Sequence, residues 1–370
     1  MDPDRTANGA HQMTIHRRLR VVVWSTGGIG SNAIRAISRR PDLELVGVWV
    51  HSPDKVGRDA GELSGGAPIG LAATDDADLL IALRPDCVVY SASGPDRDVA
   101  AVPDYERFLA AGINVVTTTS TRLVFPPVYE QASRDRLAKA ATSGGASLYA
   151  SGIFPGFASD QLALVLATQS STIRTIKATE ISLNDHYPVA SVMMDGMGFG
   201  RPLDFEPHLS RPGYIQGAWQ APIELIAQGL GVELDEIRGQ LDRSLTNRDI
   251  DVAFGTIPAG TCGAVRTSAV GIVGGREAIV LEHIIRMSRD VAPEWPVSDH
   301  DATYLVSIEG DPRIELQLSL GEAEGHGAGA NAMTATAMRV VNAVPFVVEA
   351  APGLVSSLDL PLTLPKHAFH

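Results

Sequence analysis

The stretch V-V-V-W-S-T-G-G-I-G, which runs from Val21 to Gly30, decides the fold. Its apolar half is typical of a buried parallel strand, and its glycine-rich half is typical of the turn that leads into a helix. Apolar residues then recur at helical spacing up to Pro41, and a second apolar run from Leu43 to Val50 follows. These segments predict a strand–helix–strand unit of the length that a dinucleotide site needs.

The glycine-rich turn has the chemistry of a pyrophosphate site, because its backbone N–H groups and the following helix N-terminus can hold an anion. Gly27 would let the backbone approach the phosphates, and Gly30 would let the helix pack closely on the strand. Ser25 occupies the place of the first glycine in the usual G-x-G-x-x-G pattern, so a tight turn without a ligand is the alternative interpretation. The strands on both sides favour the dinucleotide. We expect the phosphates to contact Ser25, Thr26, Gly27, Gly28, Ile29 and Gly30.

The composition argues against several classes of protein. With 370 residues, 45% of them hydrophobic and 20% charged, the chain can form two domains with sizeable cores. Its net charge of -13 argues against nucleic acid or an anionic membrane surface as the main partner. No apolar stretch approaches the ~20 residues of a membrane-spanning helix.

The two cysteines and the polar first residues predict a cytoplasmic protein. Cys87 and Cys262 lie in apolar or glycine-rich surroundings without metal-ligand spacing, so we expect buried thiols in a reducing compartment and no metal. Residues 1–18 lack the apolar core of a signal peptide, so we expect a disordered leader.

Strands and helices alternate as far as residue 154, which predicts a doubly wound parallel sheet. Beyond it the segments become strand-rich, and several alternate in hydrophobicity, as residues 302–308 do. This alternation is typical of a mainly antiparallel sheet with one covered face. Helices are expected at 221–230, 233–241 and about 331–344. The predicted class is α/β, with a Rossmann domain over 19–154, an α+β domain for substrate and dimerisation over 155–330, and a C-terminal helix and tail over 331–370 that pack back on the Rossmann domain.

The loop after the second strand decides which nicotinamide dinucleotide is preferred. An acidic residue at this strand end would bind the ribose 2′-hydroxyl, whereas the strand here ends at His51 and Ser52. With Lys55 and Arg58, these side chains suit a 2′-phosphate, so we expect NADP, with NAD as the alternative. Solvated loop charges, with Arg58 partly neutralised by Asp59, are the non-binding interpretation. The loops after the third and fourth strands would complete the cofactor site with Ser91, Ala92, Ser93, Thr117 and Thr118.

Four segments carry a family resemblance: S-T-G-G-I-G at 25–30, H-S-P-D-K-V-G-R-D-A-G-E-L at 51–63, A-G-I-N-V-V-T-T at 111–118 and G-I-F-P-G-F-A-S-D at 152–160. They resemble the dihydrodipicolinate reductase-like family, and within it the branch of 2,4-diaminopentanoate dehydrogenase and the native amine dehydrogenases. The segments M-G-F-G-R-P, E-W-P and N-A-V-P look similar to actinobacterial members. The resemblance implies a Rossmann domain, a C-terminal α+β domain whose sheet helps to form a homodimer, and hydride transfer to or from a C=N bond.

The chain departs from the family pattern at three places. Dihydrodipicolinate reductases carry a His-His pair followed by lysine, and the matching stretch E-I-S-L-N-D-H-Y-P at 180–188 has one histidine and no lysine. The amine dehydrogenases carry a glutamate just after the strand that here continues as T-T-T-S-T-R at 117–122, which contains no acid. Phe154 stands where the family usually has Asn or His. These departures argue against lysine biosynthesis and against reductive amination by the usual route.

Three residues are candidates for the proton donor. His186 and Tyr187 follow the first strand of the second domain, and an imidazole has a suitable ordinary pKa of roughly 6.5. The hydroxyl of Ser120 can bond a substrate oxygen. The alternatives are a satisfied loop pair and a strand-end hydroxyl bonded to the backbone. The substrate is expected to contact Thr119, Phe154 and Met194, and the methionines near Met194 suit an apolar compound.

The sequence thus favours an NAD(P)H-dependent oxidoreductase that transfers hydride to or from a C=N or C=O bond of a small to medium, rather apolar substrate. A catalytically inactive NADP-binding sensor or assembly protein is the alternative, because the expected glutamate is absent. We expect a homodimer with a small-molecule substrate and no nucleic-acid or membrane partner. His283 we interpret as a sheet or interface residue.

Overall fold

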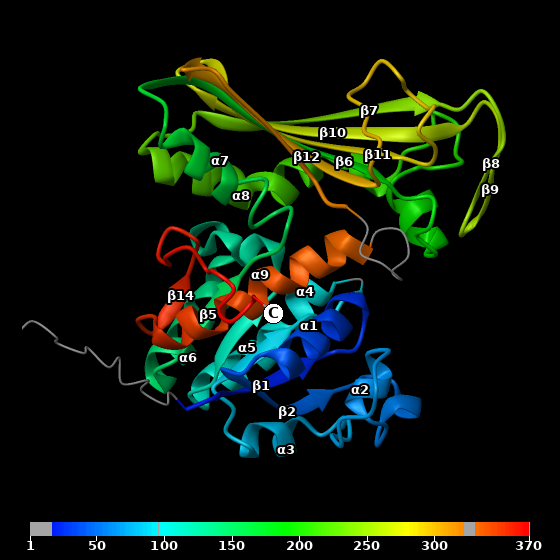
Figure 1. Cartoon of the computed structure of the whole chain (residues 1–370). Coiled ribbons are helices and arrows are strands. Elements are labelled where there is room, and N and C mark those ends of the chain that lie inside the picture. Colours follow the sequence, from blue (N-terminus) through cyan, green and yellow to red (C-terminus); the bar gives the residue numbers. More distant parts are fainter. Residues whose placement is uncertain (1–16, 95, 322–329, 370) are drawn as a thin grey trace, which may run out of the picture.

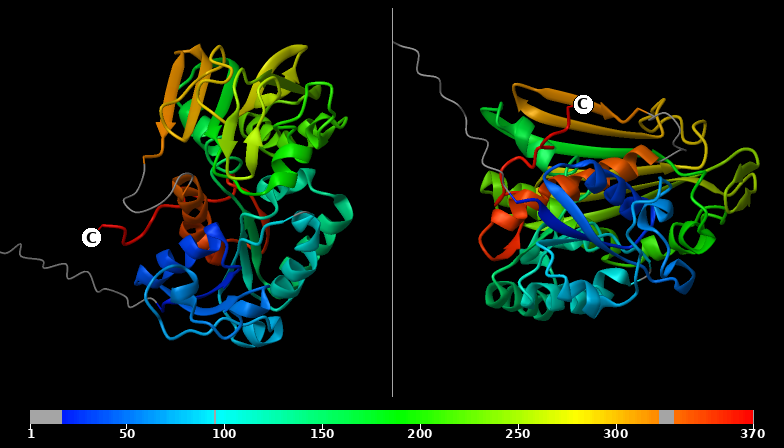
Figure 2. Two further views of the ribbon diagram at one scale, coloured as in Figure 1. Left: turned by 90° about the vertical axis from the view of Figure 1, so that its right-hand side faces the viewer. Right: turned by 60° about the horizontal axis from the view of Figure 1, so that its bottom comes forward.

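The computed structural model describes residues 17–94, 96–321 and 330–369 (Figure 1). Two sheets lie one above the other, with helices between them and around the lower sheet (Figures 1 and 2). The leader predicted at 1–18 lies outside the described residues except for its last two positions. Of these, Arg17 forms an ion pair with Asp86, with 2.6 Å between Nη2 and Oδ1.

The first sheet is parallel and doubly wound. Its main elements are β1 (Leu19–Trp24), α1 (Gly28–Arg39), β2 (Leu43–Trp49), β3 (Cys87–Tyr90), α5 (Val102–Ala110), β4 (Asn114–Thr117), α6 (Gln131–Gly144), β5 (Ser147–Ala150), α9 (Ala330–Glu349) and β14 (Gly353–Val355). The strand order is β14-β5-β4-β3-β1-β2. Val21 and Val23 pack with α1 and α9, whereas Val22 and Trp24 pack with α5 and α6. Both faces of β1 are therefore buried, which explains its continuous apolar run.

Short elements connect these strands and helices. They are η1 (Pro53–Lys55), α2 (Ala60–Leu63), α3 (Ala77–Ala82), α4 (Arg97–Ala100), η2 (Thr121–Val124) and η3 (Pro126–Val128). None of the helices in the described ranges has the length and apolar character needed to cross a membrane.

The second sheet has the strand order β13-β12-β6-β11-β10-β7. Its elements are α7 (Gln161–Ala167), β6 (Thr172–Leu183), η4 (Ser191–Gly196), η5 (His208–Ser210), α8 (Tyr214–Leu230), β7 (Glu236–Leu245), β10 (Cys262–Val273), β11 (Arg276–Arg286), β12 (Ala302–Asp311) and β13 (Ile314–Ser319), beside a small hairpin of β8 (Ile250–Val252) and β9 (Gly255–Ile257). All of its strand pairs are antiparallel except β11 with β6. Helices α7 and α8 cover the face that is turned toward the first sheet (Figure 1). The predicted α/β class, with a mainly antiparallel second sheet, is confirmed.

The helix predicted at 233–241 is wrong, because most of this segment belongs to the edge strand β7. Leu234, Ile237 and Leu241 have helical spacing, but β7 pairs along its length with β10. Gly239 is a poor helix former, and the side chain of Gln216 lies where a Cβ at this position would be. Tertiary pairing therefore overrides the local pattern. The helix expected at 221–230 is present as the second half of α8.

Two helices join the layers. Ala221 and Leu225 of α8 enter the core of the first domain, whereas Ile223 and Ile226 pack under the second sheet. Helix α9 lies beside α1, and β14 then adds a strand next to β5 (Figures 1 and 2). The end of the chain thus returns to the first sheet.

Candidate active site

The turn after β1 has the backbone shape of a phosphate site. Ser25 has a φ of 95°, in the left-handed region that favours glycine, so this position requires the backbone of the glycine that it replaces. At Gly30 a Cβ would run into the carbonyl oxygen of Ser25, so only glycine lets α1 begin this close to β1. Gly27 is exposed. The nearest atom to a Cβ at this position would be Ser25 Oγ, at a distance of 3.9 Å. The space in front of the turn is therefore open.

The N-terminus of α1 faces this turn. Gly27 is the N-cap residue and has no side chain that could bond the first N–H groups of the helix. These N–H groups are the donors that hold a pyrophosphate in dinucleotide sites. Gly28 is exposed and is approached by Met333 of α9, so α9 borders the turn. Thr26 is buried and Ile29 half-buried, and the segment 25–30 as a whole fits a dinucleotide.

The loop after β2 places a cation at the phosphate turn. Lys55 Nζ donates a hydrogen bond to Thr26 Oγ1 at 3.2 Å. The carboxylate of Asp59 accepts hydrogen bonds from backbone N–H groups on α2 and at residues 69–71, and these hold its pKa below the ordinary value. Asp59 is therefore engaged by the backbone rather than by the exposed Arg58. At the strand end itself, His51 is exposed and Ser52 is half-buried.

The loops after β3 and β4 are tied together at the strand ends. Ser91 is buried, and its hydroxyl donates to the carbonyl oxygen of Trp24 at 3.3 Å. The hydroxyl of Thr119 donates to the carbonyl oxygen of Ala92 at 2.7 Å. Ser93 is exposed beyond this bond. The loops thus form one continuous rim beside the phosphate turn.

A small pocket of about 80 Å³ lies at the ends of β4 and β5. Thr117 and Thr118 line it from the expected cofactor loop, and Phe154 lines it from the expected substrate segment. A cis peptide bond joins Phe154 to Pro155, and Thr336 of α9 also reaches the pocket. Residues expected to bind the cofactor and a residue expected to bind the substrate therefore share one cavity.

The three candidate proton donors do not line this pocket. Ser120 is fully buried, and its hydroxyl bonds the hydroxyl of Tyr105 at 3.1 Å and the carbonyl oxygen of Asp98 at 3.3 Å. These bonds favour the structural interpretation of Ser120. His186 and Tyr187 lie on the exposed turn after β6, with His186 Nδ1 3.4 Å from Asp185 Oδ1. Met194 is half-buried on η4.

A row of polar side chains crosses the second sheet on the face that α7 and α8 partly cover. The strand register places Glu180 of β6 between His283 of β11 and Tyr304 of β12. Glu180 Oε2 lies 3.4 Å from His283 Nε2. Sequence reasoning missed this row, although a glutamate at an alternate position of an apolar strand was a visible signal. The strand assignment of His283 is correct, but its polar partner Glu180 comes from another strand, β6.

Burial shifts the pKa of each member of this row. It raises the pKa of Glu180 to about 8, lowers the pKa of His283 to about 4, and raises the pKa of Tyr304. The relative solvent exposure of the side chain is 14% for Glu180 and 21% for His283. Near neutral pH the carboxyl group therefore holds a proton, and the imidazole is uncharged.

Aromatic rings connect the polar row with the pocket at the ends of β4 and β5. The Phe154 ring, which lines that pocket, lies 6.1 Å from the Tyr304 ring and 5.2 Å from the Trp219 ring, measured between centroids. The Trp219 ring in turn lies 6.2 Å from the His283 ring, at an angle of 87°. An apolar wall therefore runs from the cofactor loops to Glu180 and its neighbours.

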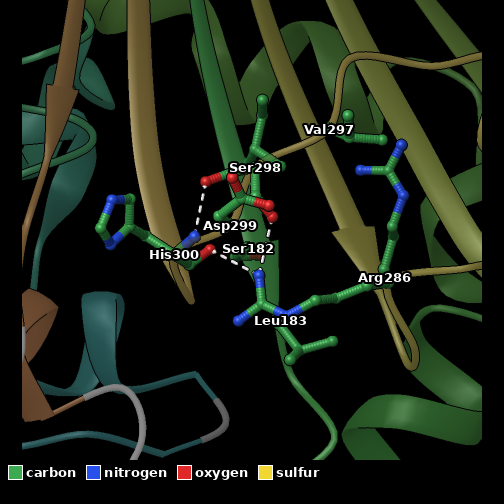
Figure 3. Close-up of a pocket in the computed structure, with 9 residues that line it drawn as sticks. Ser182, Leu183, Arg286, Val297, Ser298, Asp299 and His300 are labelled. Carbon is green, nitrogen blue, oxygen red and sulfur yellow. Dashed lines mark hydrogen bonds between the residues drawn. The ribbon is translucent and has the colours of Figure 1, made fainter.

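A second pocket, of about 230 Å³, lies at the end of β6 (Figure 3). Ser182 and Leu183 line it from β6, Arg286 lines it from β11, and residues 297–300 line it from a loop. Ser182 Oγ lies 3.2 Å from His283 Nε2, so its hydroxyl belongs to the polar row. In the part of the chain that the structure describes, no group of three His, Cys, Asp or Glu side chains is arranged to hold a metal ion.

Comparison with known proteins identifies the family. Residues 157–368 match the 2,4-diaminopentanoate dehydrogenase C-terminal domain. An amine dehydrogenase of Streptomyces virginiae is 41% identical over 350 residues, which cover 92% of this chain and 96% of the relative. This chain belongs to the 2,4-diaminopentanoate dehydrogenase family. The 2,4-diaminopentanoate dehydrogenase of Acetoanaerobium sticklandii is 22% identical over 93% of this chain and 94% of its own.

A solved structure shows the same fold. The amine dehydrogenase of Mycobacterium smegmatis superimposes with a TM-score of 0.73 at 21% identity, over 95% of this chain and 98% of that chain. The expected family and enzyme class are thus confirmed: this member of the 2,4-diaminopentanoate dehydrogenase family is an oxidoreductase. Its parallel sheet and open glycine turn fit a nicotinamide dinucleotide, the cofactor class of such dehydrogenases.

Proposed function

We propose that this protein is an NADP-dependent amine dehydrogenase for small to medium, rather apolar amines. The observation that carries the proposal is the 41% identity, over 92% of the chain, to a protein named amine dehydrogenase. In the oxidative direction, an amine, water and the oxidised dinucleotide give a carbonyl compound, ammonia, the reduced dinucleotide and one proton. When bound, the nicotinamide accepts or donates the hydride.

The chain's own residues would hold the dinucleotide at two places. Residues 25–30 and the N-terminus of α1 would bind the pyrophosphate, because their backbone donors face open space. Thr117 and Thr118 would border the nicotinamide, with Ser91, Ala92 and Ser93 beside them, since these loops follow neighbouring parallel strands. This arrangement would bring the reacting carbon to the pocket that Phe154 lines.

The preference for NADP rests on the loop after β2. Lys55 already contacts Thr26 at the phosphate turn, and Arg58 is exposed on the same loop. With His51 and Ser52 they would surround a 2′-phosphate with donors. Asp59 bonds the backbone and leaves the charge of Arg58 available.

Apolar walls support an apolar substrate. Ile153, Phe154 and Val124 line the pocket at the ends of β4 and β5, and Trp219 extends the same wall. Phe154 replaces the polar residue that the family resemblance leads one to expect there, which favours hydrocarbon substituents over polar ones. Thr119 and Met194, both half-buried, are the further contacts that we propose.

The second sheet fits the homodimer that the resemblance implies. Its face away from α7 and α8 carries no helix in the described residues (Figure 1). A groove of about 530 Å³ crosses this face between β6, β12 and β13, with Lys177, Leu305 and Gln317 among its lining residues. Sedimentation velocity of the wild type and of Leu305→Glu tests the assignment: we expect a dimer and a shift toward monomer, respectively.

The proposed reaction is tested in two steps. NADPH and NADH binding is first measured by fluorescence titration, and NADPH consumption is then followed with a panel of ketones and aldehydes, each with and without ammonia. We expect consumption with apolar ketones that depends on ammonia. Consumption without ammonia would instead indicate a carbonyl reductase.

The inactive sensor remains the alternative that this experiment addresses, because the loop at 118–122 has no carboxylate. Tight NADPH binding without turnover of any compound would support it. Failure to bind either dinucleotide would overturn both functions.

A further inference from the structure

Glu180 has the position that an amine-binding carboxylate needs. It lies on the inner face of β6, since Ile176 and Ala178, at alternate positions of the same strand, pack under α7 and α8. The register sets His283 on one side of it and Tyr304 on the other. Tyr304 packs with Ile153 and Phe154, which line the pocket at the ends of β4 and β5. Glu180 is therefore connected to that pocket through the side chains of Tyr304 and Phe154.

Few basic side chains lie near the carboxyl group of Glu180. His283 is the only basic side chain within 4 Å of its carboxylate among the described residues, and Tyr304 and Ser182 are its other polar neighbours. The Tyr304 hydroxyl is buried beside the Glu180 carboxyl group and interacts with it. Trp219 and Phe154 contribute rings without charge. Glu180 therefore lies beside a tyrosine hydroxyl and an uncharged imidazole, and no other basic side chain of the described residues lies within 4 Å of it.

The polar row continues from Glu180 to Ser182. His283 Nε2 lies 3.4 Å from Glu180 Oε2 and 3.2 Å from Ser182 Oγ. Ser182 lines the pocket shown in Figure 3, beside Ser298 and His300.

We propose that Glu180 binds the amino group of the substrate and accepts its proton. This inference rests on the proposed function, and it assigns to β6 the carboxylate that the loop at 117–122 lacks. In the oxidative direction, an N–H bond of the ammonium group breaks and the O–H bond of the Glu180 carboxyl group forms. The electron pair stays on nitrogen, which gives the neutral amine from which a bound oxidised nicotinamide would take the hydride. In the aminating direction the carboxyl group returns the proton.

The aromatic rings strengthen this assignment. An ammonium or iminium nitrogen at Glu180 would lie close to the Tyr304 ring, and aromatic faces attract cations. Its alkyl substituents would extend along the same apolar wall toward the cofactor loops. The site thus combines one acid with an apolar enclosure.

Protonation gives a test that does not depend on turnover. Burial raises the pKa of Glu180 to about 8, so at pH 7 binding of an alkylammonium ion requires the carboxyl group to release its proton. The groups that face Glu180 do not mask this release, because the pKa of His283 is about 4 and that of Tyr304 is raised. We expect about one proton released for each amine bound.

The experiment uses the full-length protein loaded with NADPH and 2-aminobutane as the probe. Calorimetric titration in two buffers of different ionisation enthalpy gives both the affinity and the number of protons released. The variants are Glu180→Gln and, as the matched control, Glu282→Gln. Glu282 is also a buried strand glutamate, but it pairs with Lys177, at 3.1 Å, on the opposite face. Amine oxidation with NADP+ is measured in parallel.

For wild type and E282Q we expect proton release and equal turnover. For E180Q we expect no proton release, at least tenfold weaker amine binding and a 10²- to 10⁴-fold lower kcat, with NADPH binding unchanged. NADPH binding reports that the variant is folded. Wild-type protein that binds the amine without releasing a proton would overturn the role of Glu180, as would turnover by E180Q within twofold of wild type. Wild-type protein that oxidises no amine would instead refute the proposed function.

Discussion

Glu180 of β6 and His283 of β11 lie side by side, 3.4 Å apart between Oε2 and Nε2, and both are uncharged near pH 7. Burial raises the pKa of the acid and lowers that of the base, so the pair is the reverse of an ordinary salt bridge. At a pH at which the carboxyl group would ionise in the unfolded chain, keeping it protonated in the folded protein lowers the free energy of unfolding. The Glu180 carboxyl group therefore contributes stability that is lost as the pH rises toward 8.

The stability of the wild type should fall between pH 6.5 and 8. In the unfolded chain Glu180 ionises at its ordinary pKa of 4.5, whereas in the folded protein it keeps its proton up to about 8. The unfolded state then binds fewer protons, so stability decreases as pH rises through this range. His283 contributes little above its ordinary pKa of 6.5. Relative to Glu180→Gln, we expect a loss of about 2 kcal/mol, measured by urea unfolding at each pH. Parallel curves for the two proteins would contradict the pKa assigned to Glu180.

Replacing Lys55 and Arg58 by alanine should weaken NADPH binding more than NADH binding. A charge-assisted hydrogen bond to a phosphate is worth about 1.5–3 kcal/mol, so we expect at least a tenfold rise in the NADPH Kd. Fluorescence titration with both dinucleotides measures the difference. Lys139→Ala, which removes an exposed lysine from α6, serves as the control. Equal losses for NADPH and NADH would show that this loop does not recognise the 2′-phosphate.

Two glycines of the same turn should respond differently to alanine. At Gly30 a Cβ meets the carbonyl oxygen of Ser25, so Gly30→Ala should lower both the melting temperature and dinucleotide affinity. At Gly27 a Cβ enters open space, so Gly27→Ala should leave the melting temperature within about 2 °C and weaken binding, because that space belongs to the phosphates. Differential scanning fluorimetry with and without NADPH measures both effects. Unchanged NADPH affinity in the Gly27 variant would place the pyrophosphate elsewhere.

Removing the Ser120 hydroxyl should affect stability rather than catalysis. Its bonds to Tyr105 and to the Asp98 carbonyl are buried, so Ser120→Ala should cost about 1–2 kcal/mol in unfolding free energy. We expect kcat within twofold of wild type, determined by amine oxidation with NADP+. Thr118→Val, in the pocket at the ends of β4 and β5, is the comparison variant and should lower the rate. A hundredfold loss of kcat in S120A would restore Ser120 as a proton donor.

Local patterns were enough to predict the first domain. The run at 21–24 is buried on both faces, and Gly30 is required by close packing, so residues adjacent in sequence carry both signals. Local sequence patterns predicted the secondary structure of the second domain less well. The segment 236–245 has helical spacing but forms an edge strand, because β10 offers it a complete set of partners. Strand β14 was also missed, since three residues after a long helix carry little periodicity.

The sequence by itself determined the dinucleotide fold and the family, because these depend on short contiguous segments such as S-T-G-G-I-G. Only the tertiary structure brought together Glu180, His283 and Tyr304, which come from three strands, with Glu180 more than a hundred residues before the other two. Their pKa values arise from burial between two sheets, and burial depends on the packing of the whole chain. The residues that can move a proton were therefore visible only in the folded protein.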